Sequence, residues 1–518
     1  MLEAFLNPDL LPETQTAIRI AYGSLLVGTL LFFLRHGRRF FLSSRYGGYS
    51  AETSAVTTIQ NPLVFPIVAA VWLTAGVLLT FGQWTVAAAA VNAVCCWYFF
   101  VAMRWSGLHR GFGAPGFMTW WLGMAVFLLE FTSQFAPQAR SLAILAIQAD
   151  FAFIMLSAGI YKSIAGYAHN EGMNYGLANP AWGYWPRQFA HVRPNHWFLR
   201  IANHLGWSVE IIGAVMMLIP GLRFWGGLAV LLSFVYVWGN IRLGTLCGVV
   251  IACCLFFFVP GSLGSNAIVA VMPTAWTNST VIAVSGSAWL TTVTTVLLTT
   301  YLALLPVAHA GLFYNFLSKK SLPKPLQTAL TRYTNMLGLI IWRVFSADHT
   351  RFFVRIYAQP RHADNSQHQD SLTGKTLRHD DAAELPETLF VTPKAGRRVI
   401  NDYAARVPRF RHVVESITLT CIFTSRRYFA SRPEVFEDKL VTYARTLPHA
   451  EGEQVIFQYV HMEKMESGYR YLIESELTVD LTDNSVTERA FESRRAIPAP
   501  RSVVFESASH GSYVAKGA

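Results

Sequence analysis

Lys162 is the side chain in this sequence best suited to chemistry. It ends the hydrophobic run of residues 151–162, and a loop rich in glycine and aromatic residues follows it. A lysine at membrane depth costs about 2.5–3.5 kcal/mol on insertion scales, so its presence calls for an explanation. Removal from water favours the neutral amine, which can accept a proton as a general base. The alternative is a lysine at a helix end whose amine reaches back to the interface.

Glu210 is the second candidate, because it lies inside the apolar segment 204–220. A carboxylate at that depth is costly unless it is paired, protonated or facing a cavity. Its nearest candidate partners are Lys162 and Arg242. Other polar residues lie in or at the ends of apolar segments: Glu130, Gln148, Asp150 and Asn240. A structural network of ion pairs is an alternative explanation for the whole set.

The connection of residues 163–203 is too polar to span a membrane and too aromatic for a plain linker. Its large aromatic residues suit a membrane interface: Trp182, Tyr184, Trp185 and Trp197. Its histidines have no spacing typical of a metal site: His169, His191 and His196. Two interpretations stay open. The segment is either an interfacial helix with an aromatic belt or a lid over a site next to Lys162.

Composition indicates the class of protein that must position these residues. The chain has 518 residues, of which 53% are hydrophobic and 14% charged, and its long apolar runs stop near residue 317. This pattern predicts a polytopic α-helical membrane domain followed by a soluble region. We expect nine spans, near residues 16–34, 62–81, 84–103, 115–136, 141–162, 204–220, 223–239, 244–260 and 288–313.

Basic residues collect in every second connection between these spans. They are Arg35, Arg38, Arg39 and Arg45 in the first, Arg104 and Arg110 in the third, Arg187, Arg193 and Arg200 in the fifth, and Lys319, Lys320 and Lys324 after the last. With nine spans these segments share one side, which the positive-inside rule makes cytoplasmic. The same side then holds Lys162 and the C-terminal region.

Net charge and cysteine usage exclude several classes of function. The net charge of +11 is partly the loop bias, and it suits lipid headgroups better than nucleic acid, for which we find no motif. Five of the six cysteines lie in apolar runs, and no CxxC motif occurs. We therefore expect no disulfide framework and no metal.

The C-terminal region reads as a separate α+β domain with an antiparallel sheet. Alternating segments predict strands at residues 351–359, 415–425, 453–462, 469–481 and 485–494, with a hairpin turn at Asp483-Asn484. Residues 434–447 have the period of a helix. The expected division is a membrane domain at 1–317, a basic connector at 318–345, a soluble domain at 346–500 and a flexible tail at 501–518.

Several short motifs resemble one membrane-protein family. SAGIYK at residues 157–162 and EGMNY at 171–175 resemble the A-G-V-K-K…E-G-Y-S-M segment of vitamin K-dependent gamma-glutamyl carboxylase. They also resemble the broader bacterial family that shares its membrane domain, the horizontally transferred transmembrane (HTTM) family. The first apolar segment, residues 104–123 and residues 340–358 resemble further segments of that family. The resemblance covers residues 15–260 and, with fewer matches, 340–360.

The resemblance implies an enzyme of a bacterial cytoplasmic membrane that uses a base driven by oxidation of a quinol. In the carboxylase, a lysine deprotonates vitamin K hydroquinone, and oxygen turns the quinol into an epoxide through a strongly basic alkoxide. The alkoxide removes a proton from a glutamate side chain, and carbon dioxide adds to the carbanion. By position, Lys162 matches the catalytic lysine, His109 the active-site histidine and Glu210 an aspartate-bearing helix.

The expected co-substrates are therefore a reduced quinone (vitamin K or menaquinol), oxygen and carbon dioxide, with a peptide or protein as acceptor. Asn240 matches an asparagine of a later segment, and Tyr161 stands where the family has the first of two lysines. Trp105 belongs to the segment that matches a tryptophan–histidine motif. These three are the expected substrate-binding residues.

Besides Tyr161 in place of the first lysine, three further departures from the family pattern matter. The histidine of the family's F-H-C-M-N segment is missing, because the run here reads VYVWGN. No part of the soluble region matches the propeptide-binding parts of the carboxylase. The lysine and the C-terminal domain of the carboxylase face the lumen, whereas the charge pattern here favours the cytoplasmic side.

Two functional hypotheses follow. The first is a carboxylase-like enzyme, in which Lys162, His109 and Glu210 converge on a cavity open to lipid. The second is a non-catalytic maturation or partner protein that binds a lipid or peptide and docks a partner through its soluble domain. A transporter is a third alternative, which the lack of inverted repeats with paired broken helices weakens.

Overall fold

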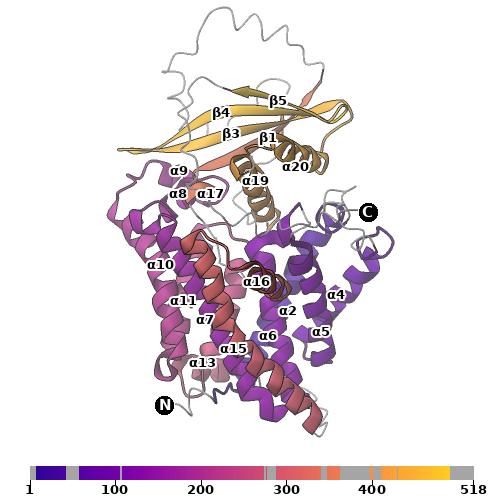
Figure 1. Cartoon of the computed structure of the whole chain (residues 1–518), viewed down its shortest axis with the longest axis vertical. Coiled ribbons are helices and arrows are strands. Elements are labelled where there is room, and N and C mark those ends of the chain that lie inside the picture. The colour runs from indigo at the N-terminus through magenta and orange to yellow at the C-terminus, as the bar shows by residue number, and fades with distance from the viewer. Residues whose placement is uncertain are drawn as a thin grey trace, which may run out of the picture.

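A helical bundle forms one end of the molecule, and a β-sheet with two helices forms the other (Figure 1). The computed structural model describes residues 7–42, 58–104, 108–273, 276, 287–339, 347–361, 397–400, 410–428 and 430–490. Figure 1 shows the soluble domain over one end of the bundle, with the connections at that end directly beneath it.

Six helices of the described chain are long and apolar enough to cross a membrane. They are α2 (Pro12–Leu34), α6 (Gly113–Phe135), α7 (Arg140–Ile164), α10 (Trp197–Leu218), α11 (Arg223–Asn240) and α15 (Ala288–Ser318). A helix satisfies its own backbone hydrogen bonds, which is why apolar runs of this length form helices in lipid. These six helices are consistent with an integral membrane protein.

Three further apolar segments form helices that are shorter than a full span. They are α4 (Phe65–Thr80), α5 (Thr85–Cys96) with a π-helical turn η3 (Trp97–Val101), and α12 (Leu246–Cys254) with the turn η9 (Leu255–Phe257). A straight crossing of the hydrocarbon core takes about 20 residues. The expected count of nine spans therefore stays a prediction.

Short elements complete the membrane domain. They are α3 (Gly37–Phe40), α8 (Met173–Ala178), α9 (Pro186–Ala190), α13 (Leu263–Val271) and the amphipathic α16 (Lys324–Leu337). The connection 163–203 is thus built from a 3₁₀ turn, η7 (Tyr167–His169), and two short helices before α10 begins. It is not one continuous interfacial helix.

Helix α7 lies in the interior of the bundle. In the most apolar 18-residue window of the segment that contains α7, 83% of the residues are buried. In the corresponding window of the peripheral α15, 22% are buried. It packs against α6, α10 and α15. Polar side chains on α7 are therefore surrounded by protein, and each of them needs a partner.

The soluble domain contains a five-stranded sheet in the order β2-β1-β3-β4-β5. Its strands are β1 (Phe352–Pro360), β2 (Arg398–Val399), β3 (Glu453–Met465), β4 (Gly468–Asp480) and β5 (Ser485–Ala490), and all neighbours are antiparallel. Asn484 has a positive φ of 59° in the turn before β5. The expected antiparallel sheet and hairpin turn are confirmed.

Two helices cover part of this sheet: α19 (Phe410–Tyr428) and α20 (Pro433–Arg445). The expected helix at 434–447 is confirmed as α20, whereas the strand expected at 415–425 is wrong, because these residues lie in α19. Leu419, Ile422 and Phe423 follow helical spacing and pack into the core under the sheet. Tertiary packing therefore overrides the strand preference of this Thr- and Ile-rich segment.

The sheet belongs to two hydrophobic cores. Phe352, Val354 and Ile356 of β1 pack with α19 and α20. The alternate residue Phe353 joins the core of the membrane domain, together with Val460 and other residues of β3 and β4. The register of β3 against β4 shifts between Tyr459 and Val460, and such bulges increase the twist of a sheet. The shift lies where the packing changes from one core to the other.

Candidate functional site

Lys162 and Glu210 form a direct ion pair inside the membrane domain. The Nζ of Lys162 lies 2.5 Å from Oε1 of Glu210 and 3.5 Å from the carbonyl oxygen of Gly206. The Lys162 side chain is 12% exposed and that of Glu210 is 3% exposed. Of the two partners considered for Glu210, Lys162 is thus the one in contact. Arg242 lies instead over the ring of Tyr184, 5.4 Å from its centroid.

Close packing of α7 on α10 brings the pair together. A Cβ on Gly159 would lie 2.7 Å from Cγ1 of Ile211 and 2.8 Å from the carbonyl oxygen of Trp207. Because glycine has no side chain, the two helices approach at this point, one turn before Lys162. On α10, Gly206 and Glu210 are four residues apart and share the face that meets Lys162.

A small cavity adjoins the ion pair. Its volume is about 30 Å³, and it is lined by residues of α7, α10, α11, α12 and the loop after α7. Tyr167 and Met173 come from that loop and line the cavity, and the Tyr167 ring centroid lies 5.9 Å from the Nζ of Lys162. One water needs roughly 10–15 Å³ of such space, so the cavity holds about two waters.

A quinol does not fit this arrangement as it stands. A fused two-ring quinol is several times larger than about two waters, and much of the lining is apolar, including Met155, Phe234 and Leu246. The residues present can hold water beside a buried amine and carboxylate. They can also pass a proton between the pair and a small group in the cavity.

His109 lies in a different place from the one expected. Its Nδ1 is 2.9 Å from Oγ1 of Thr418 in α19, and its ring packs on Phe40. It is fully buried, and burial together with the nearby Arg39 guanidinium lowers its pKa to about 3. It does not line the cavity beside Lys162. The expected convergence of His109 with the ion pair is therefore not observed.

Arg39 makes a polar junction between the membrane and soluble domains near His109. It donates hydrogen bonds to Glu415, to the Tyr443 hydroxyl at 3.3 Å and to Oγ1 of Thr446 at 3.2 Å. The Glu415 carboxylate beside it raises the pKa of Arg39 against the effect of burial. His109 thus belongs to a docking contact for α19 and α20.

The expected substrate-binding residues do not gather at the cavity. The Nδ2 of Asn240 donates to the Tyr236 carbonyl oxygen at 2.8 Å, at the end of α11. Tyr161 packs on Phe316 of α15, with 5.6 Å between the ring centroids. Trp105 lies outside the described residues.

The loop after α7 joins the cavity to the sheet. Glu171 accepts a hydrogen bond from Arg351 at 2.6 Å and lies 3.8 Å from the Nζ of Lys464. Both cations also lie over the ring of Tyr175, with Arg351 5.3 Å and Lys464 5.1 Å from its centroid. Residues 167 and 173 line the cavity, so the loop covers it. The sequence indicated the loop as a candidate lid but not its partners, Arg351 just before β1 and Lys464 in β3.

Asp150 has partners that explain its burial. The indole of Trp121 and the hydroxyl of Tyr301 both donate to its Oδ2 at 2.7 Å. The carboxyl thereby ties α7 to α6 and α15. Glu130 likewise accepts a hydrogen bond from Gln15 at 3.1 Å. These contacts support the structural interpretation for both residues.

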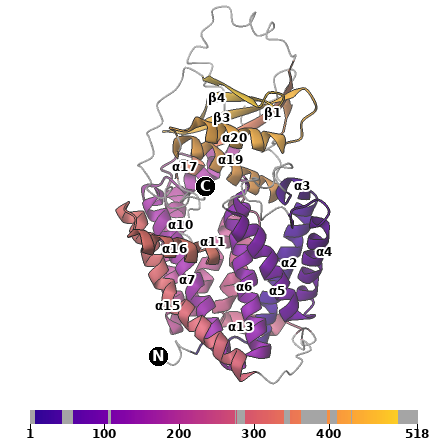
Figure 2. The ribbon, with the colours of Figure 1, turned by 45° about the vertical axis from the view of Figure 1, so that its right-hand side comes forward.

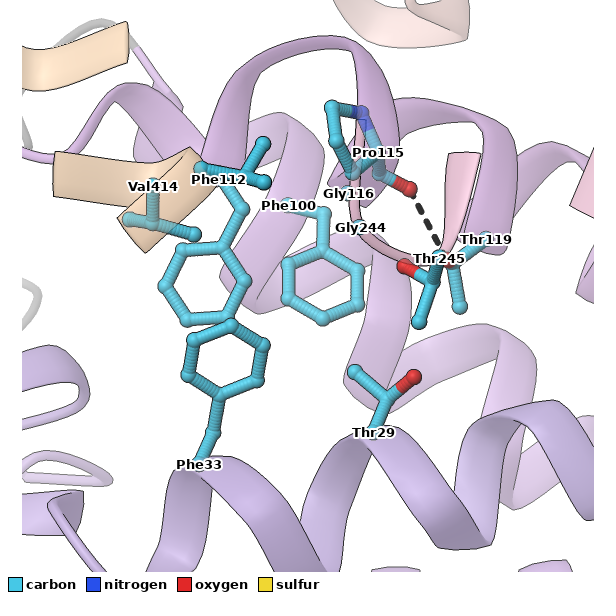
Figure 3. Close-up of a pocket in the computed structure, with 11 residues that line it drawn as sticks. Thr29, Phe33, Phe100, Phe112, Pro115, Gly116, Thr119, Gly244, Thr245 and Val414 are labelled. Carbon is cyan, nitrogen blue, oxygen red and sulfur yellow. Dashed lines mark hydrogen bonds between the residues drawn. The ribbon is translucent and has the colours of Figure 1, made fainter. Parts of the chain in front are cut away.

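A second, smaller cavity lies where α2, α6 and α19 meet. Figure 3 shows Phe33, Phe100 and Phe112 gathered on one side of it and the hydroxyls of Thr29 and Thr245 on the other. Its volume is about 10 Å³, which is room for one water at most. No titratable side chain lines it.

The connections at the sheet end of the bundle share one face of the molecule. Arg39, His109 and Glu171 come from the first, third and fifth connections, and each contacts the soluble domain. This arrangement agrees with the charge pattern of the sequence. Which side of the membrane this face occupies stays a prediction.

No group of histidine, cysteine, aspartate and glutamate side chains suited to a metal occurs among the described residues. Comparison of the chain with protein families, with curated proteins and with solved structures found no match. A function therefore has to be inferred from the chemistry of the site.

Proposed function

We propose that this chain is an integral membrane enzyme of the carboxylase-like type, in which Lys162 accepts a proton from a substrate at the cavity. The observation that carries the proposal is the buried contact between Lys162 and Glu210, 2.5 Å apart beside a water-sized cavity. Buried titratable pairs of this kind are common at catalytic sites.

The pair supplies a base by an internal proton transfer. In the ion pair the proton is on Lys162. Its transfer to Glu210 leaves a neutral amine and a neutral carboxylic acid, which lowers the cost of holding charge away from water. The amine then takes a proton from an acidic O–H or C–H group in the cavity. The Gly206 carbonyl and the Tyr167 ring keep the amine pointed at that group.

The substrate class comes from the resemblance in the sequence. A vitamin K-type quinol or menaquinol, with oxygen, carbon dioxide and a glutamate-bearing peptide, is the set to test first. The cavity of about 30 Å³ excludes a quinol unless its walls move.

The small cavity supports a second function, a non-catalytic maturation or partner protein. In that case the Lys162 pair is a structural contact, and the soluble domain docks the partner. The burial of apolar residues of β1 and β3 against the membrane domain supports this function, because it fixes the sheet as a rigid platform. The double replacement Lys162→Met/Glu210→Leu, which leaves no buried charge, would then leave function intact.

Quinol turnover by the purified protein tests the two functions. Reduced vitamin K or menaquinol, oxygen and bicarbonate are supplied, and epoxide is measured for wild type, Lys162→Ala and the exposed-cation control Arg193→Ala. The enzyme proposal expects epoxide from wild type and the control and none from Lys162→Ala. No epoxide from folded wild type with several quinols would refute the carboxylase-like reaction and favour the partner protein.

A further inference from the structure

Helix α16 and the turn before it carry an unusual concentration of positive charge. Lys319, Lys320 and Lys324 lie at the start of this segment and Arg332 lies further along α16, and all four are exposed. Residues 211–347 contain no aspartate or glutamate. The segment therefore has four cations and no acidic residue of its own to neutralise them.

These cations also lack acidic partners from elsewhere in the described chain. None of the four takes part in an ion pair within the described ranges. In the soluble domain, by contrast, Arg398 pairs with Glu453 and Arg426 with Glu488, each at 2.6 Å. The surface of α16 is thus complementary to an anion that the chain itself does not supply.

One side of α16 is fixed to the membrane domain. Leu330, Tyr333 and Leu337 pack with a small core that includes Leu305 of α15 and Ala149 of α7. On the helix, Lys324 and Arg332 are two turns apart and lie on the same side, away from these packed residues. The cations therefore point away from the bundle.

Apolar side chains are exposed beside the cations. They are Tyr314 and Leu317 at the end of α15 and Leu326 and Met336 on α16. A helix with exposed apolar residues next to lysine and arginine is typical of one that lies in the plane of a membrane surface. The cations and the exposed apolar side chains together match a lipid, whose phosphate group and acyl chain meet at the membrane interface.

The position of α16 in the fold agrees with a place at the membrane interface. It follows α15 directly and crosses the side of the bundle below the soluble domain (Figure 2). At its far end, the indole of Trp97 donates to the Met336 carbonyl oxygen at 3.2 Å. Tryptophan is enriched at membrane interfaces, where the ring meets the headgroups.

We propose that α16 and residues 319–323 form a binding surface for anionic phospholipid headgroups. The ammonium groups and the Arg332 guanidinium would bind the lipid phosphates, while Leu326 and Met336 enter the acyl boundary. Anionic lipid would thereby hold the connector to the soluble domain at the membrane surface. This proposal is independent of the enzyme proposed above.

The test uses the full-length protein in nanodiscs of phosphatidylcholine, alone or mixed with phosphatidylglycerol. Native mass spectrometry measures the ratio of the two lipids retained by the protein. The test variant is Lys320→Gln/Lys324→Gln. The matched control is Arg193→Gln/Arg200→Gln, which removes the same charge from exposed positions after α9. A Lys320→Arg/Lys324→Arg variant keeps the charge at the proposed surface.

We expect wild type to prefer phosphatidylglycerol over phosphatidylcholine. Each cation near an anionic surface contributes about fivefold in affinity, so removal of two cations in the test variant should lower this preference by roughly 25-fold. The control and the arginine variant should keep the preference. An equal loss in test and control variants, or no preference in wild type, would overturn the proposal. So would preferential binding of a poly-glutamate peptide in phosphatidylcholine discs that depends on Lys320 and Lys324, because it would assign the surface to an acidic protein.

Discussion

Removal of one partner from the Lys162–Glu210 pair should destabilise the membrane domain far more than removal of both. At 2.5 Å and an effective dielectric constant of about 20, the attraction between the two charges is about 7 kcal/mol. Desolvation of both ions offsets much of it, so the pair adds little net stability. A single Lys162→Met or Glu210→Leu change leaves the other charge buried and should cost about 3–5 kcal/mol.

The double variant Lys162→Met/Glu210→Leu leaves no buried charge and replaces the pair with side chains of similar volume. Its free energy of unfolding should return to within about 2 kcal/mol of wild type. The assay is unfolding of all four proteins in one lipid environment, followed by circular dichroism and analysed as a double-mutant cycle. Single variants within about 0.5 kcal/mol of wild type, with additive effects, would refute the reasoning, because the pair would then be fully solvated.

Three further predictions concern stability. His109 is neutral when folded and its pKa is lowered to about 3. Since protons then favour the unfolded state below about pH 6.5, stability should fall by about 2 kcal/mol between pH 6.5 and 5, and His109→Phe should remove that dependence in pH-dependent unfolding. Gly159→Ala would place its Cβ 2.7 Å from Ile211 and should cost about 1–3 kcal/mol; a thermal unfolding curve like that of wild type would contradict the close packing. Leu440→Ala, in the fully buried core under the sheet, should cost about 2–5 kcal/mol, and the exposed control Met465→Ala should cost little; equal effects on unfolding would refute this packing.

Much of the fold could be predicted from local sequence patterns. Apolar length predicted the long helices, and alternation predicted β3, β4 and β5 with the turn at Asp483-Asn484. The strand predicted at residues 415–425 was wrong, because the spacing of Ile417, Leu419 and Ile422 fits both a strand and a helix. The choice depends on the sheet and the membrane domain between which α19 packs, and no local pattern contains that information.

The site was predictable only in part. Burial of two opposite charges predicts that they meet, and Lys162 and Glu210 do. The contact also needs the close approach of α7 and α10 at Gly159, which the apolar pattern of the two helices does not contain. The place predicted for His109 beside Lys162 rested on the order of motifs along the chain. In the structure its neighbours are Thr418 of the soluble domain and Arg39 of the first connection.

The shared strand β1 sets an order of assembly during synthesis. Phe352 belongs to the core with α19 and α20, and its neighbour Phe353 belongs to the core of the membrane domain. The helices of the bundle are made first, and β1 emerges before the rest of its sheet. Domains generally fold from the N-terminus as the chain is made. We therefore expect β1 to pack on the finished bundle first, and β3 and β4 to be added to a strand that the membrane domain already holds.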